Sequence, residues 1–242
     1  MIEVHQFPVL SDNYAFLVRC RATSAVATID TPDGEAILAE AARLGWTITD
    51  IWNTHWHPDH AGGNAAIIAA TKARVTGPAE VARIGAMPDQ VVAGGETVRF
   101  GRAQAKVIDV GGHTLGHVAF WFEGAQTAFV GDTIFALGCG RLFEGTAEQM
   151  WASLQRLMAL PDETTLYCAH EYTASNLRYA LHVDPDNAEL QARGEVINRL
   201  RAAGLATVPM TLAQEKATNP FLRAGAAARF GELRAGKDAF RG

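Results

Sequence analysis

The residues best suited to chemistry gather in one short run, His55-Trp56-His57-Pro58-Asp59-His60. On an extended segment, residues two apart face the same way, so His55 and His57 should present both imidazoles to one point. Pro58 should end that segment, leaving Asp59 and His60 in a turn that faces a second point. Histidine is the commonest metal-binding side chain and carboxylate suits the same metals, so the run predicts a metal site rather than a histidine-rich surface turn.

Three later residues strengthen the prediction because each follows an expected strand. His113 lies in a glycine-rich turn, Asp132 follows Ala-Phe-Val-Gly, and His170 follows Thr-Leu-Tyr-Cys-Ala. A catalytic zinc takes about three protein ligands, so this many candidates predicts two ions that share a bridging carboxylate. The candidate ligands are His55, His57, Asp59, His60, His113, Asp132 and His170.

The remaining histidines and the cysteines are expected to be structural. His117 shares the turn of His113 but leads directly into a strand, which favours a hydrogen-bonding role. His5 and His182 have no ligand-type neighbours in sequence. The cysteines show no Cys-x-x-Cys spacing and are expected to be buried apolar residues; they are Cys20, Cys139 and Cys168.

Short strands with interspersed helices should position these residues. The expected strands cover 2–7, 14–19, 25–29, 50–53, 96–100, 104–109, 118–122, 127–130 and 165–168, and the expected helices cover 34–44, 64–73 and 146–159. Thr146 and Gln149 resemble a capping box. Strands of this kind imply packed sheets covered by helices. After His170 the patterns at 173–182 and 188–204 are helical, which predicts a small helical second domain over 171–242.

Composition excludes several classes of protein. Of the 242 residues, 48% are hydrophobic and 19% charged, and no apolar run is long enough to span a bilayer. The formal charge of −5 and the lack of a Lys/Arg cluster disfavour a nucleic-acid partner, a nuclease included. The N-terminus lacks the pattern of a targeting segment. We therefore expect a globular cytoplasmic protein that acts on a small molecule.

With these motifs in view, the chain resembles the metallo-β-lactamase superfamily and, within it, the hydroxyacylglutathione hydrolases, or glyoxalase II. The resemblance covers nearly the whole chain. Its further motifs are 139–146, 169–173, Asn219-Pro220-Phe221 and the C-terminal Arg234-x-x-Lys237-Asp238-x-Phe240. It implies an α+β fold, the αββα sandwich of two packed mixed sheets flanked by helices, with a catalytic domain over 1–170 and a small helical substrate-binding domain over 171–242.

The resemblance also implies roles for individual residues. His55, His57 and His113 would bind one divalent ion, while Asp59, His60 and His170 would bind the other, with Asp132 as the bridge. Asp59 and Asp132 would be the catalytic carboxylates. The ions would be zinc, with iron and manganese as alternatives. The residues matching glutathione-binding positions are Arg141, Phe143, Tyr172, Arg234 and Lys237, where Phe143 replaces a tyrosine of some members.

The implied reaction is hydrolysis of S-D-lactoylglutathione to D-lactate and glutathione by a monomer that binds neither nucleic acid nor membrane. One alternative is an iron-dependent sulfur dioxygenase acting on glutathione persulfide with a single ion. Another is a general thioesterase on the same fold. A purely structural metal is disfavoured, because structural zinc sites close with four ligands and leave the other candidates unexplained.

Overall fold

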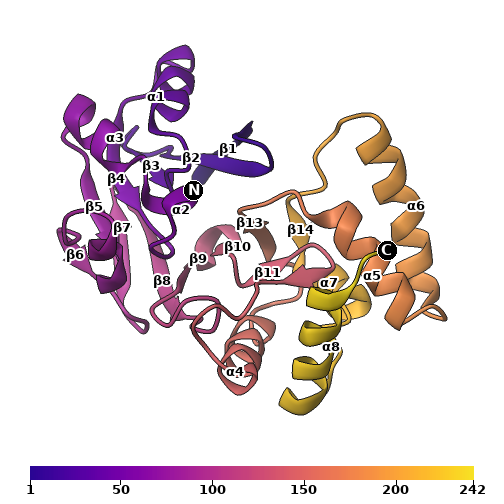
Figure 1. Cartoon of the computed structure of the whole chain (residues 1–242). Helices are drawn as coiled ribbons and strands as arrows, with labels where there is room; N and C mark the ends of the chain where they lie inside the picture. The colour runs from indigo at the N-terminus through magenta and orange to yellow at the C-terminus, as the bar shows by residue number, and fades with distance from the viewer. The chain divides into compact units, whose positions relative to one another are not determined.

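The computed structural model describes residues 1–242, and its first six-stranded sheet is mixed (Figure 1). Its strands follow chain order: β1 (Ile2–Val9), β2 (Asn13–Cys20), β3 (Val26–Ile29), β4 (Ile48–Trp52), β5 (Arg74–Gly77) and β6 (Gln90–Val91). β1, β2 and β3 pair antiparallel, whereas β3 to β6 pair parallel. Nearly every residue of β2 is buried, as expected for a strand covered on both faces.

The second six-stranded sheet has a strand order that does not follow the chain. The order is β14 (Met210–Thr211), β13 (Thr165–Cys168), β10 (Thr127–Gly131), β9 (Val118–Phe122), β8 (Ala103–Asp109) and β7 (Thr97–Phe100). In β8, buried Ala105 and Val107 alternate with exposed Gln104 and Lys106, which is the two-residue period of a strand with one buried face. A separate hairpin joins β11 (Ile134–Phe135) to β12 (Gly138–Cys139).

The chain divides into two compact units. The first unit comprises Met1–Asp109 and Gly116–Gly131, and the second comprises Val110–Leu115 and Asp132–Gly242. This division differs from the boundary at residue 170 predicted from sequence, and that boundary remains a prediction. The division places α4 (Ala147–Met158) with the C-terminal helices.

An aromatic core lies between the sheet faces of the first unit. The Trp52 ring on β4 stacks on Phe122 of β9 at 5.6 Å between centroids and meets the Phe100 ring edge-on at 5.3 Å. Phe16 on β2 contacts Phe129 on β10 at 5.3 Å. Helices α1 (Gly34–Arg43) and α3 (Asn64–Thr71) join a second apolar cluster with the first sheet, through side chains such as Ile37, Ile67 and Leu17. The central strands β2 and β3 of the first sheet are therefore buried on both faces.

Helices dominate the second unit. They are α4 (Ala147–Met158), α5 (Thr173–Val183), α6 (Ala188–Ala202), α7 (Leu212–Thr218) and α8 (Ala227–Ala239). Leu177 and Ala180 of α5 pack with Leu190 and Ile197 of α6 in one buried cluster. The capping box expected at Thr146 and Gln149 is confirmed at the start of α4. No helix of the chain combines the length and apolarity that crossing a bilayer requires.

The α+β architecture of two sheets flanked by helices is confirmed, while several elements, most of them short, were missed. These are α2 (Pro58–Ala61), α7, α8, β5, β6, β11, β12, β14 and the 3-10 turns Ala79–Arg83 and Glu123–Ala125. Elements this short carry too few residues for a period to show. In α8, which has thirteen residues, the buried Phe230, Leu233 and Arg234 are surrounded by small and charged side chains, so no apolar stripe marks it.

Candidate metal centre and adjoining pocket

The segment from His55 to His57 lies in a loop and not on a strand, so the expectation of an extended segment before Pro58 was wrong. Strand β4 ends at Trp52, and α2 begins at Pro58 with His57 as its N-cap residue. Proline is favoured in the first helical turn because its missing N–H is not needed there. The imidazoles still converge, because the loop brings His55 Nε2 to 2.9 Å from His57 Nδ1.

Asp30 organises this loop, and sequence reasoning missed it. Its carboxylate is 3% exposed and accepts hydrogen bonds from the Thr54 N–H at 2.7 Å, the Thr54 hydroxyl at 2.8 Å and His60 Nδ1 at 2.9 Å. Because a carboxylate only accepts, His60 Nδ1 carries the proton and Nε2 keeps the lone pair. Asp30 directly follows β3, so the strand-end rule that singled out Asp132 could have found it.

The same carboxylate acts on His55 through Thr54. The Thr54 hydroxyl donates to Asp30, so the hydroxyl oxygen is left to accept from His55 Nδ1, 3.0 Å away. His55 Nε2 then also keeps its lone pair, as a metal-binding imidazole requires. One buried carboxylate therefore sets the tautomers of two candidate ligands.

Asn13 orients the carboxylate of Asp59, which is a predicted metal ligand. The buried Asn13 side chain lies at the start of β2 and donates to Asp59 Oδ2 at 3.1 Å. That bond orients one oxygen of a side chain that is otherwise 39% exposed. The sequence does not reveal this role, because nothing near Asn13 indicates a partner 46 positions away.

The carboxylate of Asp132, which the sequence predicts to be a bridging ligand, lies between two imidazoles. Its two oxygens face different imidazoles, with Oδ2 at 3.3 Å from His113 Nε2 and Oδ1 at 3.4 Å from His170 Nε2. The preceding Gly131 has a φ of 48°, and a Cβ there would lie 2.6 Å from the Thr54 hydroxyl oxygen. Only glycine therefore fits at the turn that leads from β10 to Asp132.

His113 is also fixed in a metal-binding tautomer. Its Nδ1 lies 2.8 Å from the carbonyl oxygen of Arg141, which can only accept, so Nδ1 donates and Nε2 keeps the lone pair. On its other side, Phe143 meets the His113 ring at 5.2 Å between centroids. Tyr172 stacks on His170 with ring planes only 2° apart. Two residues predicted to bind substrate thus pack against two histidines predicted to bind metal.

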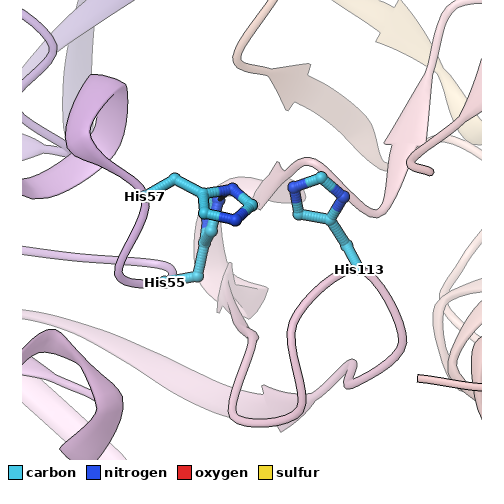
Figure 2. Close-up of side chains that lie close together, drawn as sticks. All are labelled: His55, His57 and His113. Carbon is cyan, nitrogen blue, oxygen red and sulfur yellow. Dashed lines mark hydrogen bonds between the residues drawn. The ribbon is translucent and has the colours of Figure 1, made fainter. Parts of the chain in front are cut away.

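Histidine and aspartate side chains form groups able to bind metal ions. Within each group the ligand atoms lie within 4.8 Å of one another, and the groups are His55, His57 and His113; His55, His60 and Asp132; and Asp59, His60 and His170. Figure 2 draws the first group. Every residue predicted as a ligand occurs in a group, and the imidazole and carboxylate donors with their fixed tautomers suit divalent ions such as zinc. His117 belongs to none and stacks on the His55 ring at 4.5 Å.

The residues predicted to bind substrate line a pocket of about 430 Å³ in the second unit. Its volume is in the range of small-molecule sites. Two predicted ligands contribute to its wall, together with residues that the sequence analysis did not single out, such as Ser175, Asn176 and Arg241. The predicted residues in its lining are His113, Asp132, Arg141, Phe143, Tyr172, Arg234 and Lys237.

Positive charge dominates one side of this pocket. Lys237 donates to the carbonyl and the hydroxyl oxygen of Ser175 at 2.9 and 2.8 Å. Burial, and to a smaller extent the cations of Arg234, Arg178 and Arg141, lower the pKa of Lys237 from its ordinary 10.5 to about 8, while Asp238 opposes them. Such an excess of cations favours an anionic ligand.

Arg234 lines the pocket, but its guanidinium is engaged by the protein. The side chain is buried, with Nη1 donating to the Cys139 carbonyl at 2.7 Å and Nη2 to Asp238 at 2.9 Å. It therefore fastens α8 to β12. Burial raises the pKa of the neighbouring Cys139 thiol to about 11, so this thiol is a poor nucleophile at neutral pH.

Comparison with known protein families accounts for nearly the whole chain. Residues 27–170 match the model of the metallo-beta-lactamase superfamily, and residues 171–240 match that of the hydroxyacylglutathione hydrolase C-terminus. The chain thus has the metallo-β-lactamase fold. It belongs to the hydroxyacylglutathione hydrolase family, whose members are hydrolases.

Curated relatives are similar to this chain over their full length. A hydroxyacylglutathione hydrolase of Erythrobacter litoralis is 54% identical, covering 99% of this chain and all of the relative. Another, from Methylococcus capsulatus, is 48% identical over the whole of both chains. The predicted family and class of enzyme are therefore confirmed.

Two solved structures show the same fold. ETHE1 from Myxococcus xanthus matches with a TM-score of 0.75 and 26% identity, over 99% of this chain and 92% of its own. TTHA1623, crystallised in a di-iron-bound form, matches with a TM-score of 0.66 and 25% identity, over 91% of this chain and all of its own. A fold neighbour of this chain thus holds two metal ions.

Proposed function

We propose that this enzyme hydrolyses S-D-lactoylglutathione and related S-2-hydroxyacylglutathiones to the 2-hydroxy acid and glutathione, as the second step of methylglyoxal detoxification. The observation that carries the proposal is the joint lining of one pocket by candidate metal ligands and by cations. Glutathione carries two carboxylates, which charge-assisted hydrogen bonds from arginine and lysine would recognise. The thioester carbonyl would then lie near Asp132 and His113.

The ligand set suits two divalent ions, and we propose zinc, with iron and manganese as alternatives. His55, His57 and His113 would hold one ion, Asp59, His60 and His170 the other, and Asp132 both. Bound there, the ions would lower the pKa of bound water toward about 7 and polarise the carbonyl. We also propose a cytoplasmic monomer that works without a nucleic-acid or membrane partner.

The residues of the chain have separate tasks in this reaction. Asp30, Thr54 and the Arg141 carbonyl hold the protons of three imidazoles away from the metal side. Arg141, Lys237 and Arg241 bind the carboxylates of the thiol part. The leaving thiolate has an ordinary pKa near ~8.5, so it departs without a protein acid. Nothing in this scheme needs a cysteine or serine nucleophile.

The direct test is hydrolysis of S-D-lactoylglutathione by the purified, metal-loaded protein, followed by the loss of thioester absorbance. A thioester of the same acyl group on a thiol without carboxylates is the control, and it should react at least tenfold more slowly at low concentration, because the cationic side of the pocket gives about 1.5–3 kcal/mol per charge-assisted bond. Equal rates would indicate a general thioesterase. A single iron per chain with oxygen uptake would indicate a dioxygenase.

Replacing Arg141 with alanine should raise KM for S-D-lactoylglutathione about tenfold and leave kcat and metal content within about twofold. The reason is that the side chain faces the pocket, whereas the bond to His113 comes from the backbone carbonyl and survives the substitution. Arg223→Ala is the matched control, because Arg223 lies outside the pocket lining and pairs with Asp184 at 3.3 Å. A lower metal content in Arg141→Ala would contradict this division of roles.

Alkaline pH should weaken substrate capture through Lys237. Because the pKa of Lys237 in the folded enzyme is about 8, its cation is present below pH 8 and is lost as the pH rises through that value. At pH 9 only about a tenth of the side chains remain charged. The expected result is a fall of kcat/KM between pH 7 and 9, up to about tenfold after subtraction of spontaneous hydrolysis. Lys237→Arg should remove this fall, and an unchanged profile in that variant would refute the assignment.

A further inference from the structure

A cluster of buried polar side chains in the second unit forms hydrogen bonds with the backbone of the β11–β12 hairpin. Glu215 and Asn219, both on or next to α7, are 0% exposed, and Asn176 on α5 is 6% exposed. Polar side chains are rarely buried so completely unless each is hydrogen-bonded. We call Glu215, Asn219 and Asn176 the hairpin clamp.

The clamp binds four consecutive residues of the hairpin. Glu215 Oε2 accepts from the Leu137 N–H at 2.9 Å. The Asn219 amide donates to the carbonyls of Phe135 at 3.3 Å and Gly138 at 3.0 Å. The Asn176 amide donates to the Ala136 carbonyl at 3.1 Å. These four contacts satisfy the hairpin backbone at its turn, where Leu137 has a φ of 58°.

The clamp residues are also hydrogen-bonded to one another and to α6. Asn219 also donates to Glu215 Oε2 at 2.9 Å, and Arg193 of α6 donates to Glu215 Oε1 and, at 2.6 Å, to the Thr218 hydroxyl oxygen. The Glu215 carboxylate therefore receives donors on both oxygens, and Arg193 balances its charge. Such a network fixes position well because removing one member leaves the others unsatisfied.

The hairpin lies in the chain between Asp132 and Arg141. It begins two residues after Asp132 and ends at Cys139, just before Arg141, whose carbonyl orients His113. The spacing to these residues is tight, since a Cβ on Gly140 would lie 2.0 Å from the Asp132 carbonyl oxygen. A shift of the hairpin must therefore move Asp132 or Arg141, or both.

We propose that the hairpin clamp is a positioning device that holds Asp132 and the Arg141 carbonyl in the geometry needed for metal binding and turnover. The proposal rests on the proposed function, because its effect is measured in the same hydrolysis. The helical part of the second unit thus acts on the metal ligands through the hairpin backbone, and Glu215, Asn219 and Asn176 touch neither metal nor the reacting atoms in this role.

The test compares Asn219→Ala with Asn187→Ala. Asn187 donates to the Ala217 carbonyl of α7 at 3.1 Å and caps α6, but it makes no bond to the hairpin, so it is the matched control for lost helix packing. Measured quantities are kcat, metal affinity by chelator competition and Tm. Asn219→Ala should lower kcat and metal affinity about tenfold each. Asn187→Ala should lower Tm but leave both within about twofold.

The outcomes are decisive because wild-type hydrolysis is measured alongside. Absence of wild-type activity would refute the proposed function, whereas wild-type kcat and metal affinity in a folded Asn219→Ala protein would refute the clamp. If Asn219→Ala does not fold, Asn176→Ala, which removes the bond to Ala136, takes its place, and metal affinity is then the deciding measurement because Asn176 also lines the pocket. Asn219→Gln provides the rescue test, since restoring an amide should recover part of the lost kcat if the bonds to the hairpin matter.

Discussion

Replacing Asp132 with alanine should abolish hydrolysis and metal binding together. Its two oxygens face the imidazoles of His113 and His170, so the substitution removes the side chain that we propose binds both ions. Loss of a residue that only supports a ligand costs about 10–100-fold in affinity or activity, so loss of this ligand should cost kcat more than about 100-fold. Bound metal per chain, measured by elemental analysis after dialysis, should fall in parallel.

Two comparisons make the Asp132 result interpretable. Asp132→Asn keeps the shape of the side chain but removes its charge. This variant should also lose metal, which would show that metal binding depends on the charge of Asp132 and not on its packing. Asp162→Ala is the control in the same unit, because Asp162 is exposed and forms only a surface ion pair with Lys216. Full metal content and turnover in the alanine variant would end the bridging proposal.

Replacing Asp30 should have the second largest effect, although Asp30 is not a candidate ligand. In Asp30→Ala the buried donors of Thr54 and His60 lose their acceptor, and each unsatisfied donor costs about 1–3 kcal/mol. Alanine is also disfavoured at the φ of 59° that Asp30 adopts. We expect a decrease of about 3 kcal/mol in the free energy of unfolding, measured by denaturant titration, and a loss of metal affinity.

Asp30→Asn should separate these two effects. Asparagine tolerates positive φ and its amide oxygen can still accept from the Thr54 N–H, so most stability should remain. Its NH₂ group, however, would face His60 Nδ1 and favour the tautomer with the proton on Nε2, which cannot bind a metal. Metal affinity should fall about 10–100-fold, with a changed His60 tautomer in the nitrogen NMR spectrum. Asp33→Ala, which removes the N-cap of α1, should lower stability alone. Unchanged affinity in Asp30→Asn would disprove tautomer control.

The sequence was most informative where neighbours in the chain are also neighbours in the site. The run from His55 to His60 indicates candidate ligands directly because its members are adjacent, even though His55 to His57 lie in a loop and not on a strand. The motif positions Arg141, Phe143 and Tyr172 likewise line one pocket. Asp30 and Asn13 escaped notice because they act over 24 to 46 residues, through single hydrogen bonds that leave no local pattern.

The sequence alone therefore determined the class of enzyme and the types and spacing of the candidate ligands, because these are properties of side chains and of their order in the chain. Tertiary structure decided what holds those side chains in place. It assigned the tautomers of His55, His60 and His113, it directed Arg234 to Cys139 and Asp238, and it joined the helical segment to the β11–β12 hairpin. The reason is physical: a hydrogen bond depends on the position of two atoms in space, and only folding brings distant atoms to that position.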